Sequence, residues 1–123
     1  MSNQLDITMD QGSSLKYTFT LQTGGATSFD LTGYDARLQV RKNYGSTVTE
    51  INGTLMNGKL VFVNASAGIL ELNLLPTDTS AIKFLDKDDE SLEMVYDLEV
   101  ASPAGKVYKP ARGTFTLNRE VTR

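Results

Sequence analysis

The sequence predicts an all-β fold in which two antiparallel sheets pack face to face. Three observations predict it: apolar residues recur at every second position in several segments, turn-forming residues separate those segments, and a single segment breaks the rhythm. The chain has 123 residues, a length that fits one domain with a sizeable core. We therefore expect a single β-sandwich domain spanning residues 1–123.

Five segments show the two-residue alternation most clearly. Each has apolar side chains on one face and polar side chains on the other, as in an antiparallel strand with one buried face. The segments are Leu15–Leu21, Ala36–Arg41, Leu70–Leu74, Met94–Val100 and Thr114–Asn118.

Turn residues predict two hairpins. Asn57–Gly58 separates Leu55–Met56 from Leu60–Val63, which favours a two-residue hairpin with a primed turn. Ser102–Gly105 favours a second hairpin, which joins Met94–Ala101 to Lys106–Tyr108.

The sequence also makes a prediction for each of two residues in the final strand. Pro110 should end or interrupt the strand, because proline has no N–H to donate to a neighbouring strand. Gly113 should mark a bulge or a close approach of another backbone segment.

The segment that breaks the rhythm reads "LLPTDTSAIKFL". Pro76 precedes Thr77 and Asp78, so we expect one short helical turn near residues 77–85, capped by Thr77 or Asp78. With roughly seven to nine short strands around it, the chain is predicted to form an immunoglobulin-like antiparallel β-sandwich. A small barrel is the alternative.

Residues Asp86–Ser91, named here the acidic loop, follow the helical turn. Alternate carboxylates could wrap a calcium ion, which takes oxygen ligands. The segment lacks the glycine and the twelve-residue length of the common calcium loop, so a solvated loop is favoured and no metal is predicted. The acids are Asp86, Asp88, Asp89 and Glu90.

Composition argues against catalysis. The chain has no cysteine and no histidine, so thiolate chemistry, disulfides and the commonest general base are all missing. The acids fall on polar strand faces or in the acidic loop, and nothing pairs two of them across a cleft. We therefore expect a protein that is not an enzyme and that uses no cofactor.

Charge and hydropathy restrict the partners. The net charge of −3 offers a nucleic-acid backbone no overall attraction. No apolar run approaches the ~20 residues that span a bilayer, and the first residues lack the pattern of a signal peptide. We expect neither nucleic acid nor membrane as a partner.

Charge is also segregated along the chain. Residues 78–99 hold eight acids and two lysines, a balance of −6, whereas residues 101–123 hold five basic residues and one acid, a balance of +4. Opposite patches would allow copies of the chain, or different partners, to meet with complementary potential. Neutralisation between neighbouring strands of one molecule explains the same pattern.

Exposed aromatic residues could form a platform for a sugar. Alternation places five of the ten aromatic residues in the core, and Tyr44, in a turn, is the best surface candidate. Those predicted to be in the core are Tyr17, Phe19, Phe62, Tyr96 and Phe115.

Four segments together resemble a known family. They read "MDQGSSLKYTFTL", "FDLTGYDARLQVRKNYGS", "GILELNLLPTDTSAI" and "MVYDLEVASPAGKVYKPARGTFTLNREVTR", and they cover nearly the whole chain. Their order and spacing resemble small virion proteins of tailed bacteriophages, related to the immunoglobulin-like amino-terminal domain of phage upper baseplate proteins.

The resemblance implies a structural protein of the virion, made in the host cytoplasm. It would act as a tail or baseplate adaptor through contacts with other virion proteins, in multiple copies within a symmetric assembly. A capsid decoration protein that contacts the major capsid protein is one alternative, and a virion-borne module that binds host glycans is another.

The residues that we expect to make protein contacts carry charge on the polar strand face or near the end of the last strand. The same residues are also explained by ordinary surface solubility. They are Arg37, Arg41, Arg119, Glu120 and Arg123.

Overall fold

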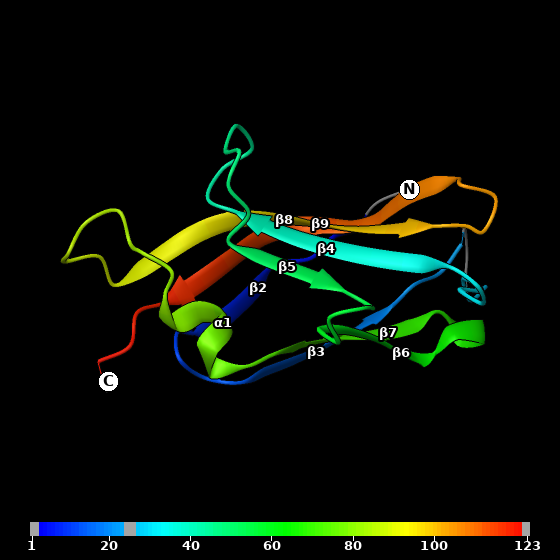
Figure 1. Ribbon diagram of the computed structural model, residues 1–123, viewed down its shortest axis with the longest axis horizontal. Coiled ribbons are helices and arrows are strands. Elements are labelled where there is room, and N and C mark those ends of the chain that lie inside the picture. Colours follow the sequence, from blue (N-terminus) through cyan, green and yellow to red (C-terminus); the bar gives the residue numbers. More distant parts are fainter. Residues whose placement is uncertain (1–2, 24–26, 122–123) are drawn as a thin grey trace.

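Two β-sheets packed face to face make up the protein, seen in a computed structural model that describes residues 3–23 and 27–121 (Figure 1). The prediction of an all-β sandwich is confirmed. The first sheet contains β1 (Asn3–Gln4), β2 (Ile7–Asp10), β4 (Asp35–Arg41), β5 (Ile51–Thr54), β8 (Ser91–Ala101) and β9 (Val107–Asn118). The second contains β3 (Leu15–Thr20), β6 (Leu60–Asn64) and β7 (Ile69–Leu74).

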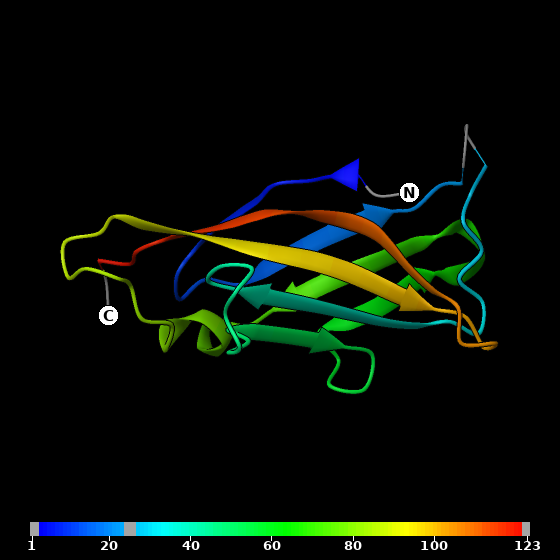
Figure 2. The ribbon, with the colours of Figure 1, turned by 90° about the horizontal axis from the view of Figure 1, so that it is seen from above.

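The strand order is that of an immunoglobulin-like sandwich. The first sheet runs β1-β9-β8-β4-β5, with β2 also on β9, and the second runs β3-β7-β6. Immunoglobulin domains place their second, fourth and fifth core strands (B, D and E) in one sheet and C, F and G in the other, with C′ added in the variable type. Taken in chain order, β3 to β9 divide in the same way. Within the described residues, β1 and β2 alone pair in parallel, both with β9 (Figure 2).

The core lies between the two sheets and comes from alternate residues of both. Its largest fully buried side chains include Phe19, Leu70 and Leu72 on one side and Leu98 and Phe115 on the other. Each such side chain stabilises the folded state by about 1.5–3 kcal/mol relative to exposure. Among the aromatics expected in the core, Phe19, Tyr96 and Phe115 are buried, while Tyr17 and Phe62 are only partly buried.

The predicted helical turn is present as α1 (Pro76–Ser80), but it ends five residues before the expected bound and its N-cap is Leu75 rather than Thr77 or Asp78. A second short turn, η1 (Ala65–Ala67), was not predicted. Proline is favoured at the first helical position because its missing N–H would have no partner there. Asp78 contributes to the start of α1, since its Oδ2 accepts a hydrogen bond of 2.7 Å from the Leu75 N–H. No helix among the described residues is long and apolar enough to cross a membrane.

The prediction of a hairpin at Asn57–Gly58 is wrong. β5 pairs with β4 and β6 pairs with β7, so the connection between β5 and β6 crosses from one sheet to the other. Gly58 has a positive φ of 80°, but Asn57 does not, which excludes the primed turn. Instead the Asn57 Oδ1 accepts hydrogen bonds from the backbone N–H groups of Thr54 and Lys59, both at 3.0 Å.

The hairpin at Ser102–Gly105 is confirmed, and it joins β8 to β9. Pro110 lies inside β9 and does not end it. The register between the strands shifts near Pro110: Leu98 lies opposite Ala111, but Val100 lies opposite Tyr108. The shift is a β-bulge that adds one residue to β9, and it accommodates a residue with no N–H.

A close approach at Gly113 anchors the N-terminal segment. The segment between β1 and β2 runs beside β9, and there the Leu5 carbonyl oxygen accepts a hydrogen bond of 2.5 Å from the Tyr96 hydroxyl. Burial raises the pKa of Tyr96, so this hydroxyl stays protonated and remains a donor. A Cβ atom on Gly113 would lie 2.3 Å from the Leu5 oxygen, which confirms the expected close backbone contact.

We predict that Gly113→Ala lowers the free energy of unfolding by about 1–3 kcal/mol, because the new methyl group must push Leu5 away from Tyr96. Chemical denaturation measures the change. Gly45→Ala is the matched control: its Cβ would meet nothing nearer than the Asn43 side chain at 3.6 Å, so its effect should stay within about 0.5 kcal/mol. Equal effects of the two substitutions would contradict the close contact.

Candidate binding face

The outer surface of the first sheet carries a charged depression. It is built from the side chains of β4, β8 and β9 that alternate with core residues, and it encloses about 450 Å³. We call this surface the charged face. It is lined by Arg37, Gln39, Arg41, Tyr44, Val95, Asp97, Glu99, Lys109 and Arg112.

The register of the strands decides which of these side chains meet. Across β4 and β8, Arg37 lies opposite Glu99 and Arg41 lies opposite Val95. Across β8 and β9, Asp97 lies opposite Arg112. Directly opposite residues have Cβ atoms about 4.5–5.5 Å apart, so unlike charges on neighbouring strands are brought within reach of each other.

The bulge at Pro110 places two cations on the same face. Lys109 and Arg112 are three residues apart, and in a regular strand that spacing puts side chains on opposite faces. The extra residue in β9 changes this: Pro110 and Ala111 are both buried, while Lys109 and Arg112 are both exposed. The bulge therefore adds Lys109 to the charged face.

Part of the charge on this face is neutralised within the sheet. The Arg37 guanidinium pairs with Glu99 at 2.8 Å, and the Lys109 ammonium pairs with Asp97 at 3.1 Å and Glu99 at 3.4 Å. The hydrogen bond to Asp97 raises the pKa of Lys109, which keeps this side chain cationic. Exposed pairs of this kind stabilise a fold by at most about 1 kcal/mol.

A positive excess remains. Four cations and two carboxylates give the charged face a net charge of +2, on a chain whose total is −3. The Arg41 guanidinium is held by the Ser46 carbonyl at 2.9 Å and by Gln39 at 3.0 Å. The exposed Arg112 forms no ion pair within the described residues.

Apolar surface accompanies this charge. Val95 occupies an outward position of β8 opposite Arg41 and is only half-buried. Tyr44, on the loop between β4 and β5, is 81% exposed, as expected from its place in a turn. The face thus combines cations, fixed by the sheet, with apolar groups between and beside them, a combination typical of protein contact surfaces.

Arg119 has a different setting, because it holds the acidic loop. Its Nη1 donates hydrogen bonds to the carbonyl oxygens of Asp86 at 3.1 Å, Lys87 at 2.5 Å and Asp89 at 3.3 Å. Its guanidinium also lies over the Phe84 ring, 4.9 Å from the centroid. A guanidinium therefore occupies the centre of this loop, and the described residues contain no group of His, Cys, Asp or Glu placed to hold a metal ion.

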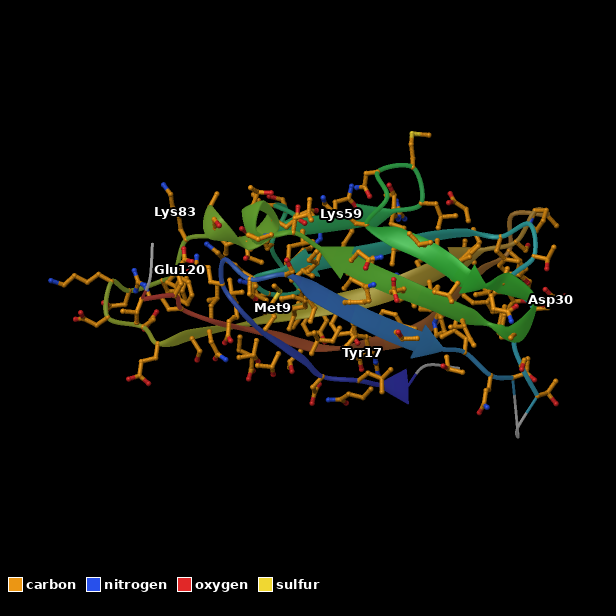
Figure 3. The ribbon with its side chains drawn as sticks, turned by 90° about the horizontal axis from the view of Figure 1, so that it is seen from below. Met9, Tyr17, Asp30, Lys59, Lys83 and Glu120 are labelled. Atoms are coloured by element: carbon orange, nitrogen blue, oxygen red, sulfur yellow. The ribbon has the colours of Figure 1, made fainter. Side chains whose placement is uncertain are left out.

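Gln11 ties the same end of the molecule together. It is buried, and its Nε2 donates to the carbonyl oxygens of Thr79 at 3.2 Å and Ile82 at 3.3 Å. Its Oε1 accepts a hydrogen bond of 3.3 Å from the Glu120 N–H. Figure 3 shows Glu120 and Lys83 at this end and Asp30 at the opposite end. One side chain thus links the segment after β2, the α1 region and the end of β9.

The residues predicted to make contacts fall in two places. Arg37 and Arg41 lie on the charged face, while Arg119 and Glu120 lie beside the acidic loop. Arg123 lies outside the described residues. The prediction did not include Lys109 and Arg112, although Val95, an apolar residue at an outward position, was a sequence signal that this part of the sheet is not merely solvated.

Comparisons with known proteins add little. No protein-family model and no curated protein sequence matches the chain. Among solved structures, one of murine CRIg is similar, with 16% sequence identity and a TM-score of 0.41 over 94% of this chain and 92% of that chain. The strand order described above, rather than this similarity, identifies the fold.

We predict that Arg119→Ala loosens the acidic loop. Loss of three hydrogen bonds from a charged donor should speed amide exchange at residues 86–90 and lower the free energy of unfolding by about 1–2 kcal/mol. Hydrogen–deuterium exchange followed by mass spectrometry measures the first effect. Arg37→Ala is the control, since Arg37 does not touch this loop. Unchanged exchange in the Arg119 variant would show that the loop is held by other contacts.

Proposed function

We propose that the chain is a non-enzymatic structural protein of a tailed-phage virion, acting as a tail or baseplate adaptor. It binds other virion proteins through the charged face. The observation that carries the proposal is that face itself: an open surface with a net charge of +2 whose cations belong to β-strands, and on which Arg37 and Lys109 form cross-strand ion pairs. The resemblance of the sequence to small phage virion proteins supports the location.

The form of the surface suits contact with another protein. Rigid β-strands position Arg37, Lys109 and Arg112, so few side chains must be ordered on binding, and the entropic cost of association is small. The exposed ion pairs make each contact weak and sensitive to salt. Weak contacts are sufficient for an adaptor, because many copies on a symmetric scaffold bind collectively.

Two other candidates use the same surface. A decoration protein on the phage head would bind the major capsid protein through the charged face, and it would be present in hundreds of copies rather than roughly six to a few dozen. A glycan-binding module is favoured by Tyr44, because an exposed aromatic ring beside arginines suits an acidic sugar.

We predict that the chain co-purifies with particles of the phage that encodes it, in a fixed number of copies. Quantitative mass spectrometry of purified virions gives that number. A double Arg41→Ala, Arg112→Ala variant should reduce occupancy at least about tenfold, because it removes the positive excess of the face.

Lys16→Ala is the matched control, since Lys16 lies on the outer side of the other sheet and is 72% exposed. Absence of the wild-type chain from virions would refute the virion role. Full occupancy by the double variant would refute the charged face as the contact surface. Binding on a glycan array without incorporation into particles would favour the sugar-binding candidate.

A further inference from the structure

We propose that the charged face receives the acidic loop of a second copy of this chain, so that copies associate head to tail. The proposal rests on the proposed function and names the partner of the same surface. It joins the two places where the residues expected to make contacts were found, and it gives each a distinct part in one interface.

The acidic loop carries more negative charge than the single Arg119 guanidinium at its centre offsets. Its four carboxylates and one lysine give a net charge of −3. None of the ion pairs among the described residues involves this loop. Asp86 and Asp89 accept hydrogen bonds from backbone N–H groups within the loop, whereas Asp88 and Glu90 are exposed. These last two carboxylates remain available to a partner.

An apolar residue stands beside these carboxylates. Leu85, directly before the acidic loop, is 79% exposed. Figures 1 and 2 show the connection between α1 and β8 extending beyond both sheets at one end of the molecule. The projecting segment carries one leucine and two available carboxylates. The charged face carries the complementary groups, because it presents Val95 and Tyr44 among arginines. Leu85 would cover the apolar groups while the carboxylates pair with Arg41 and Arg112.

The loop is already ordered before it meets a partner. Arg119 fixes three of its carbonyl groups, and the Phe84 ring packs under the same guanidinium. Gln11 fixes the chain just before it through the Ile82 carbonyl. Association therefore costs little conformational entropy at the loop. Arg119 acts as a positioning residue for the contact and does not touch the partner itself.

The geometry of such a contact is heterologous. The charged face and the acidic loop are different surfaces of one molecule, and the depression on the face shares no residue with the one beside the loop. Each copy can offer its loop to one neighbour and its face to another. Contacts of this kind close into rings when the rotation between copies allows it, as a symmetric tail requires, and otherwise extend as filaments.

Charge reversal tests this pairing with the full chain. Arg112→Glu lowers the net charge of the face of one variant from +2 to 0, and Asp88→Arg changes the net charge of the loop of a second variant from −3 to −1. Each variant should self-associate more weakly than wild type, because position 112 of the face and position 88 of the loop then carry like charges. An equimolar mixture should associate, because the two remaining combinations of face and loop are complementary.

Sedimentation velocity at low ionic strength measures association at protein concentrations up to about 1 mM. We expect each single variant to raise the dissociation constant at least about tenfold over wild type, and the mixture to recover most of that loss. Lys16→Glu makes the same change of charge on the other sheet and should behave as wild type. Circular dichroism and thermal unfolding check that every variant folds.

Three outcomes overturn the proposal. The first is a wild-type chain that stays monomeric under these conditions, because the proposal requires self-association. A mixture that associates no better than its components shows that the loop is not the occupant of the face. Saturable binding of inorganic phosphate at Arg112 without self-association assigns the face to a small anion.

The proposed function has a separate readout. Incorporation of the chain into virions without self-association would leave the adaptor role standing and remove only the second copy as partner. Self-association through the loop without incorporation into virions would support the contact between copies and refute the virion role.

Discussion

The register of β8 between β4 and β9 is the constraint on which the rest of the structure depends. Tyr96 and Leu98 point into the core, so Asp97 and Glu99 must point outward, where they meet Lys109 and Arg37. A slip of one residue would expose the apolar set and bury both carboxylates, and each buried charge would cost several kcal/mol. Hydrophobic burial therefore selects the register, and the register in turn arranges the charged face.

The N-terminal segment and one end of the sandwich are held by long-range polar contacts. The Tyr96 hydroxyl binds the Leu5 carbonyl, and Gln11 joins the segment after β2 to the α1 region and to the end of β9. Arg119 then closes the acidic loop against the end of the last strand. Because these contacts connect residues far apart in the sequence, the charged face and the acidic loop belong to one body. An adaptor needs such an arrangement, since it must hold its binding surfaces in a fixed relation.

Sequence alternation was sufficient to predict β3, β4, β7, β8 and the end of β9, because burial of one face leaves a period of two in each of them. It did not predict β2 or β5, although Ile7, Met9 and Ile51 belong to the core. Prediction from the sequence also failed at Asn57–Gly58, where the local sequence suits a hairpin but the flanking strands belong to different sheets. The pairing partners of β5 and β6 are set by distant residues. The residues that make up the charged face were predicted in part. Alternation predicts that Arg37 and Arg41 lie on the outward face of their strand. Lys109 reaches the charged face through a bulge, and the sequence alone does not show how that bulge shifts the register. The role of Arg119 was hidden because its partners are backbone carbonyls some thirty residues away.

The central claim is that the outer surface of β4, β8 and β9 is the surface by which this chain is held in an assembly. Cryo-electron microscopy of intact virions tests it most directly, because the sandwich can be fitted into the density and its covered side identified. The account predicts that neighbouring protein covers the side that carries Arg41, Val95 and Arg112 and leaves the outer side of β3 and β7 open. Density in which the charged face is open to solvent, with every contact made through the second sheet, would contradict it.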